Sequence, residues 1–119
     1  MPKSLTKNRL IAFKRQQGRC FYCDFPMWIG KPTEFIRKFH LNSRGAARFQ
    51  CTAEHLVAKQ DGGTNARRNI VAACRFCNHT RHKISSPPDP KNYHNHVMHR
   101  LKAGKWHPSN LRQLLIQDG

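Results

Sequence analysis

Acidic residues and long apolar runs are both scarce in this sequence. Only 6 of its 119 residues are Asp or Glu, against 22 Lys and Arg, which gives a formal net charge of +16. No apolar run approaches the roughly 20 residues that a membrane-spanning helix needs, so we expect no membrane partner. The first ten residues, MPKSLTKNRL, lack the apolar stretch of a signal peptide. We therefore expect a cytoplasmic (bacterial or phage-encoded) or a nuclear protein.

The length and the apolar content limit the fold. A chain of 119 residues and 13.9 kDa forms one domain of ordinary size, or a small domain with arms. This length excludes a doubly wound nucleotide-binding enzyme and a large barrel. Hydrophobic residues make up 38% of the chain, so the core is modest and a bound metal would help to stabilise it.

The basic excess extends along the whole chain. Residues 1–50 hold 11 basic and 2 acidic groups, residues 51–84 hold 6 and 2, and residues 85–119 hold 5 and 2. A compact protein with this charge favours a polyanionic partner. Nucleic acid is the usual one, because neutralising its phosphates releases condensed counterions. The alternative at this stage is a merely basic protein, such as a ribosomal one.

Local patterns predict a small α+β protein. Two short apolar stretches, 51–58 and 69–74, are typical of strands, and turn residues separate them. Residues 32–49 are basic and either helical or irregular, and the pattern does not divide them further. Helices are expected from Thr6 to about Gln17, over 75–84, from Asp89-Pro90 to about Ala103, and from Ser109 onward.

Four of the five cysteines form two C-x-x-C pairs, Cys20/Cys23 and Cys74/Cys77. Two such pairs complete a tetrahedral zinc site. Disulfides are one alternative, but a reducing compartment disfavours them. Thiol redox chemistry is another, but it needs only one exposed C-x-x-C pair, whereas this chain has two. We expect one structural Zn²⁺ per chain, with no open position for catalysis. Cys51 is expected to be a buried apolar residue.

Polar residues that suit phosphodiester chemistry lie between and just after these pairs. The spacing is EH-x13-N-x4-CxxCN-x3-H, which comprises Glu54, His55, Asn69, Asn78 and His82. In a helix that starts near residue 75, positions 78 and 82 share one face. A neutral histidine titrates near pH 6.5 and suits a general base at neutral pH.

This pattern resembles the HNH (ββα-metal) endonuclease family over about residues 5–84, where the second C-x-x-C runs into a helix as CRFCNHTRH. The resemblance implies a zinc-stapled ββα-metal motif with added helices at both termini. It implies an HNH nuclease domain at 1–84, and a basic helical extension at 85–119 that packs on it or contacts DNA. The implied activity is metal-dependent hydrolysis of DNA, by nicking or double-strand cleavage.

The resemblance also implies residue roles. His55 would be the general base and Asn69 would orient the His55 loop. Glu54, Asn78 and His82 would bind the catalytic cation, Mg²⁺ or Mn²⁺, with Ni²⁺, Co²⁺ or Zn²⁺ also compatible with a histidine ligand. The family more often has Asp or His where this chain has Glu54. Asn78 is a neutral ligand, weaker than the histidine found elsewhere in the family.

Basic residues near the motif are expected to contact phosphate, although a generic basic surface would look the same. We expect DNA as the partner, with RNA as the alternative, and a monomer or weak homodimer. Two other functions remain open: a zinc-stapled nucleic-acid-binding protein without catalysis, and a ribonuclease of similar mechanism. The candidate phosphate-contacting residues are Arg67, Arg68, Arg81 and Lys83.

Overall fold

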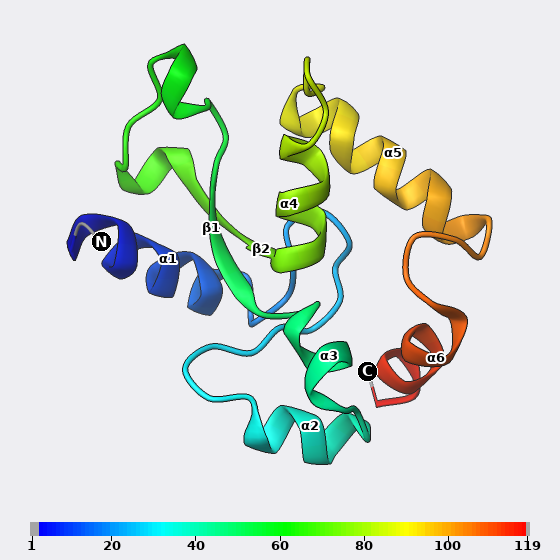
Figure 1. The fold of residues 1–119 in the computed structure, drawn as a ribbon. Coiled ribbons are helices and arrows are strands. Elements are labelled where there is room, and N and C mark those ends of the chain that lie inside the picture. The colour runs from blue at the N-terminus through cyan, green and yellow to red at the C-terminus, as the bar shows by residue number, and fades with distance from the viewer. Residues whose placement is uncertain (1–2, 119) are drawn as a thin grey trace.

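A two-stranded antiparallel hairpin with helices packed around it forms the centre of the molecule (Figure 1). The computed structural model describes residues 3–118, without the side chains of residues 114 and 116–118. No helix in this part of the chain is long and apolar enough to span a membrane. The elements are α1 (Lys3–Arg15), α2 (Thr33–Phe39), α3 (Ser43–Ala47), β1 (Cys51–His55), η1 (Lys59–Asp61), η2 (Arg67–Asn69), β2 (Ile70–Cys74), α4 (Arg75–His82), α5 (Pro90–Lys102) and α6 (Ser109–Asp118).

The hairpin and α4 form a continuous ββα unit. Cys51 pairs with Cys74 at one end of the hairpin, and His55 pairs with Ile70 at the other. Every residue of β2 is buried, because α1 and α4 both pack against the hairpin. Strand β1 is shorter than the predicted 51–58, since the chain turns away after His55 and Val57 is exposed. The fold is the small zinc-stapled ββα arrangement expected from the sequence.

Helix boundaries follow local capping chemistry. Asp89 accepts a hydrogen bond from the Asn92 backbone N–H at 2.8 Å, and Pro90 occupies the first turn of α5, as predicted. α1 begins at Lys3 rather than Thr6 and ends at Arg15. The undivided segment 32–49 contains two short helices, α2 and α3.

The described residues from 85 to 118 contribute to the same core as the ββα unit. Tyr93 and Val97 of α5 are fully buried, and the Tyr93 hydroxyl donates to the Cys77 carbonyl oxygen at 2.7 Å. His107 lies among the rings of Phe25, Phe49 and Phe76. The C-terminal segment therefore packs on the rest of the protein and covers one side of the cysteine pairs.

Candidate metal centres and active site

The two C-x-x-C pairs meet inside the protein. The sulfur atoms of Cys20, Cys23, Cys74 and Cys77 all lie within 4.8 Å of one another, and all four residues are buried. The Sγ atoms of Cys23 and Cys74 are 4.0 Å apart. Tetrahedral zinc–thiolate bonds of about 2.3 Å place two sulfurs about 3.8 Å apart. The four residues therefore fit a tetrahedral metal ion such as zinc.

Hydrogen-bond donors surround these sulfurs. The Cys74 N–H points to Cys20 Sγ at 3.2 Å, the Cys77 N–H points to Cys74 Sγ at 3.4 Å, and Trp106 Nε1 donates to Cys77 Sγ at 3.3 Å. Burial raises the pKa of Cys20, but hydrogen bonds from the other three cysteines outweigh it and hold that pKa well below the ordinary value. Burial also raises the pKa of Cys23 and Cys77. A metal ion bound here, together with these donors, would allow several thiolates to be buried side by side.

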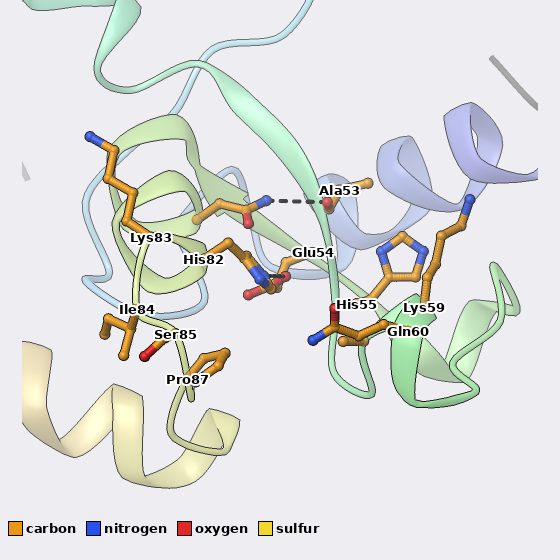
Figure 2. A pocket seen from close by; sticks show the side chains of 12 residues that line it. Ala53, Glu54, His55, Lys59, Gln60, His82, Lys83, Ile84, Ser85 and Pro87 are labelled. Atoms are coloured by element: carbon orange, nitrogen blue, oxygen red, sulfur yellow. Dashed lines mark hydrogen bonds and ion pairs between the residues drawn. The ribbon is translucent and has the colours of Figure 1, made fainter.

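A separate cavity of about 650 Å³ lies between the end of β1 and the end of α4 (Figure 2). Its walls include four of the five motif residues: Glu54, His55, Asn78 and His82. Neighbours in a strand normally face opposite sides, yet Glu54 and His55 both line this cavity. His55 is the last residue of β1, where regular pairing ends. The fold thus gathers the predicted base, His55, and the three predicted cation ligands around one space.

Glu54 is the buried polar residue of this site, with 1% of its surface exposed. Its Oε2 accepts hydrogen bonds from Tyr22 Oη at 2.9 Å and from Arg81 Nη1 at 3.0 Å. Burial raises the pKa of Tyr22, and the charge of Glu54 adds to this, so the phenol stays protonated and remains a donor. Oxygen Oε2 is therefore committed to protein partners, and Oε1 faces His82.

Glu54 and His82 point toward each other across the cavity wall (Figure 2), with Oε1 and Nε2 only 2.9 Å apart. Two ligands that bind one cation at about 2.1 Å and at right angles lie about 3.0 Å apart. The pair therefore matches the spacing of adjacent ligands on one divalent cation. His82 is partly exposed, which leaves access from solvent.

Asn78 lies one helical turn before His82. Its amide nitrogen donates to Thr52 Oγ1 at 2.9 Å and to the Ala53 carbonyl oxygen at 3.2 Å. These bonds commit the nitrogen and leave the amide oxygen as the atom that can bind a cation. Glu54, Asn78 and His82 thus offer two oxygen atoms and one nitrogen atom, a set that suits Mg²⁺, Mn²⁺ or a later divalent metal.

The imidazole of His55 has a partner that the sequence analysis did not identify. His55 Nε2 lies 2.8 Å from Asn65 Oδ1. An amide oxygen only accepts, so this contact places the proton on Nε2 and leaves the lone pair on Nδ1. Asn65 belongs to the turn-rich loop between β1 and η2, and nothing in its local sequence indicates this role.

Asn69 forms hydrogen bonds within this loop, whereas the imidazole ring of His55 is contacted by Asn65. Its side chain bonds both the N–H and the carbonyl oxygen of Val57 and the carbonyl oxygen of Thr64. Gly63 allows the loop to close, because a Cβ at that position would collide with the Val57 carbonyl oxygen. Asn69 therefore acts on His55 indirectly, by holding the loop that carries Asn65.

The four predicted phosphate-contacting residues differ in their exposure to solvent. Arg67 and Arg68 are exposed on η2, and Lys83 is exposed beside the cavity. Arg81 is buried, with 4% of its surface exposed, and its guanidinium donates to Glu54 and to the Pro88 carbonyl oxygen. The structure therefore places Arg81 inside the protein, where a phosphate does not reach it.

Comparisons with known proteins give a family match over part of the chain. Residues 37–83 match the family described as HNH endonuclease. The chain is 33% identical over 76 residues to ubiquitin carboxyl-terminal hydrolase 44 of Danio rerio, an alignment that covers 59% of the chain but only 11% of that protein. No solved structure gives a significant match. The HNH match spans β1, β2 and α4, the elements that carry Glu54, His55, Asn78 and His82.

Proposed function

With an HNH endonuclease segment at residues 37–83 as the premise, we propose that this protein is a metal-dependent endonuclease that hydrolyses phosphodiester bonds in DNA. One observation carries the proposal: His55, Glu54, Asn78 and His82 line the same cavity. A protein that only binds nucleic acid does not require a histidine base beside a set of cation ligands. The net charge of +16 supports a polyanionic substrate.

His55 takes the proton from the attacking water in this proposal. Asn65 fixes the tautomer through Nε2, so Nδ1 is the atom that accepts the proton. Asn69 restrains the loop that carries Asn65. The ring is half-buried, and therefore it is held in place while it stays accessible to water.

Glu54, Asn78 and His82 would hold the catalytic cation. When bound, a divalent cation stabilises the charge that develops on the phosphate and the leaving oxygen. The four-cysteine site is closed by its own ligands and is proposed to hold structural zinc, whose binding energy contributes to folding. The two sites are thus separate in ligand chemistry and in role.

Plasmid cleavage tests the proposal directly. The wild-type protein with added Mg²⁺ or Mn²⁺ should convert supercoiled plasmid into nicked or linear DNA. His55→Ala should lower the rate by about 10²–10⁴, the usual contribution of a general base, while its DNA affinity stays within twofold of wild type. His40→Ala is the matched control, since His40 is exposed and lies outside the cavity.

Three results would lead to different conclusions. No cleavage by the wild-type protein under any of these metals, with intact DNA binding, would favour the binding-only alternative. Cleavage of RNA but not of DNA would identify a ribonuclease of similar mechanism. Equal cleavage by wild type and His55→Ala would remove His55 from the role of base.

A further inference from the structure

A second cavity lies next to the active-site cavity, between β1 and α4. It has a volume of about 350 Å³ and shares Ala53 and Asn78 with the first cavity. Arg9 of α1 lines one side of it, and Arg75 and His79 of α4 line the other. The protein therefore offers a cationic space immediately beside the proposed scissile site, at the other end of the Asn78 side chain.

A third cavity, of about 240 Å³, shares Arg75 and His79 with the second and adds Arg44 and Lys83. Among the described residues, no acidic side chain lines the second or the third cavity. The charged side chains beside the catalytic cavity are therefore basic, which suits a phosphate backbone.

Arg9 supplies an independent sign of an anionic ligand. Its Nε is buried and has no hydrogen-bond partner in the part of the chain that the structure describes. Buried donors without a partner are uncommon in folded proteins and call for a ligand or another explanation. The Arg9 charge also opposes the burial that raises the pKa of Cys51 to about 12, which places the guanidinium near β1. Arg9 lines the cavity, so its remaining guanidinium N–H groups are the donors that a phosphate oxygen there would meet.

We propose that Arg9 and Arg75 bind a second phosphate of the substrate strand in this cavity and thereby fix the register of the strand on the active site. The proposal rests on the proposed function, because it takes the His55 cavity as the place of the scissile phosphate. Three residues of β1, from His55 back to Thr52, span about 10 Å. At this separation the second phosphate lies close to the cut on the same strand.

Binding measurements test this phosphate site without cleavage. A fluorescein-labelled 12-base-pair duplex is titrated with His55→Ala protein, without added divalent metal, over a series of KCl concentrations. Adding Arg9→Gln or Arg75→Gln should weaken binding about tenfold. Each change should also reduce the slope of log affinity against log salt by about 0.9, because one phosphate contact is lost.

Arg100→Gln is the matched control for these variants. Arg100 lies on α5, on the other side of α4 from α1 (Figure 1), and lines none of the three cavities. Its replacement removes the same charge and should change affinity less than twofold. Equal effects of Arg75→Gln and Arg100→Gln would overturn the phosphate site and show a diffuse basic surface.

Removing the charge of single DNA phosphates tests the same contact from the DNA side, where no folding defect of the protein can arise. Each phosphate of the cleaved strand is replaced in turn by a neutral methylphosphonate. One position near the cut should weaken binding to His55→Ala protein but have little effect once Arg9→Gln is also present, since the two changes remove the same contact. Independent effects at every position would overturn the proposal.

The methylphosphonate binding assay and the plasmid cleavage assay together separate the two proposals. A methylphosphonate position whose effect disappears in Arg9→Gln, together with no DNA cleavage by the wild-type protein, would support the phosphate site and reject the nuclease function. Normal cleavage without such a position would retain the nuclease function and reject the phosphate site.

Discussion

Arg81 Nη1 and Glu54 Oε2 form an ion pair of 3.0 Å, with only 5% and 2% of the two side chains exposed. The same guanidinium donates from Nε and Nη2 to the Pro88 carbonyl oxygen, at 3.1 and 2.9 Å. A carboxylate expected to bind a cation is thus already paired with a fixed positive charge. This pairing lowers the attraction of the cavity for a metal and joins β1, α4 and the segment before α5.

Replacing Arg81 should lower the stability of the fold and raise the affinity of the cavity for a metal ion. Arg81→Met leaves Glu54 buried without its counter-charge, which typically costs about 3–5 kcal/mol. Urea unfolding should show this loss, and added Mn²⁺ should recover more stability in the variant than in wild type, because the unpaired carboxylate binds the cation more tightly. Lys83→Met, at an exposed neighbour, should stay within about 0.5 kcal/mol of wild type. Wild-type stability of Arg81→Met would contradict the importance of the pair.

Purified protein should contain about one zinc ion per chain. Cys20→Ser or Cys74→Ser should lose the metal and unfold or become insoluble, because zinc binding supplies folding energy. Cys51→Ala is the control, since Cys51 is buried outside the four-cysteine cluster and should keep the zinc. Metal analysis and circular dichroism measure both effects. A folded protein without zinc would refute a structural role for the metal.

Asn65 should act through the proton equilibrium of His55. Asn65→Asp places a carboxylate 2.8 Å from the imidazole nitrogen, and a neighbouring negative charge favours the protonated ring. Since the base must be neutral, the acid limb of the pH–rate profile should move to higher pH. The rate at high pH should change much less. Thr64→Ala, in the same loop, should leave the profile in place, and an unmoved profile in Asn65→Asp would exclude the contact.

Metal dependence should identify the role of Asn78. Asn78→Ala should require more Mg²⁺ or Mn²⁺ for half-maximal cleavage, whereas Asn78→His, a stronger ligand, should equal or exceed wild type at low metal. Thr52→Val removes a hydrogen-bond acceptor of the Asn78 amide but keeps its oxygen, so it is the matched control. Brief EDTA treatment should stop cleavage without unfolding the protein. If Asn78→Ala shows the wild-type metal dependence, Asn78 is not a ligand.

His107 should make the fold sensitive to acid. Burial, and next the charge of Arg48, lower the pKa of His107 to about 3, whereas an unfolded histidine has a pKa of about 6.5. Between these values only the unfolded chain binds the proton, so stability present above pH 6.5 is lost as pH falls toward 3. His107→Gln removes this titration and keeps an acceptor for Arg48, so its pH dependence should be shallower. His40→Gln, at an exposed site, should follow wild type.

Local chemistry explains which features could be predicted from the sequence. The C-x-x-C spacing predicts two paired thiols, and the structure brings the pairs together. Asp89 and Pro90 predict the start of α5, because capping depends on adjacent residues. The C-terminal end of β1 was less predictable, since strand length depends on what covers the strand.

Contacts between distant segments explain what could not be predicted. Tyr22 and Arg81 reach Glu54 across 32 and 27 positions of the chain, and nothing in the motif indicates that they meet. The sequence shows the charge of Arg81 but not its burial, so Arg81 was predicted to contact phosphate like its exposed neighbours. Asn65 and Asn69 lie in one loop, and only the tertiary structure shows which of them contacts the imidazole.

The hydrogen bond from Trp106 Nε1 to Cys77 Sγ, 3.3 Å long, gives the protein a built-in optical signal. The other tryptophan, Trp28, donates to the Ala46 carbonyl oxygen instead. Trp28→Phe would therefore leave a protein whose indole fluorescence comes from Trp106 alone. Since a thiolate at hydrogen-bond distance alters the emission of an indole, a chelator titration of this variant would follow the occupancy of the cysteine cluster in real time, without any added dye.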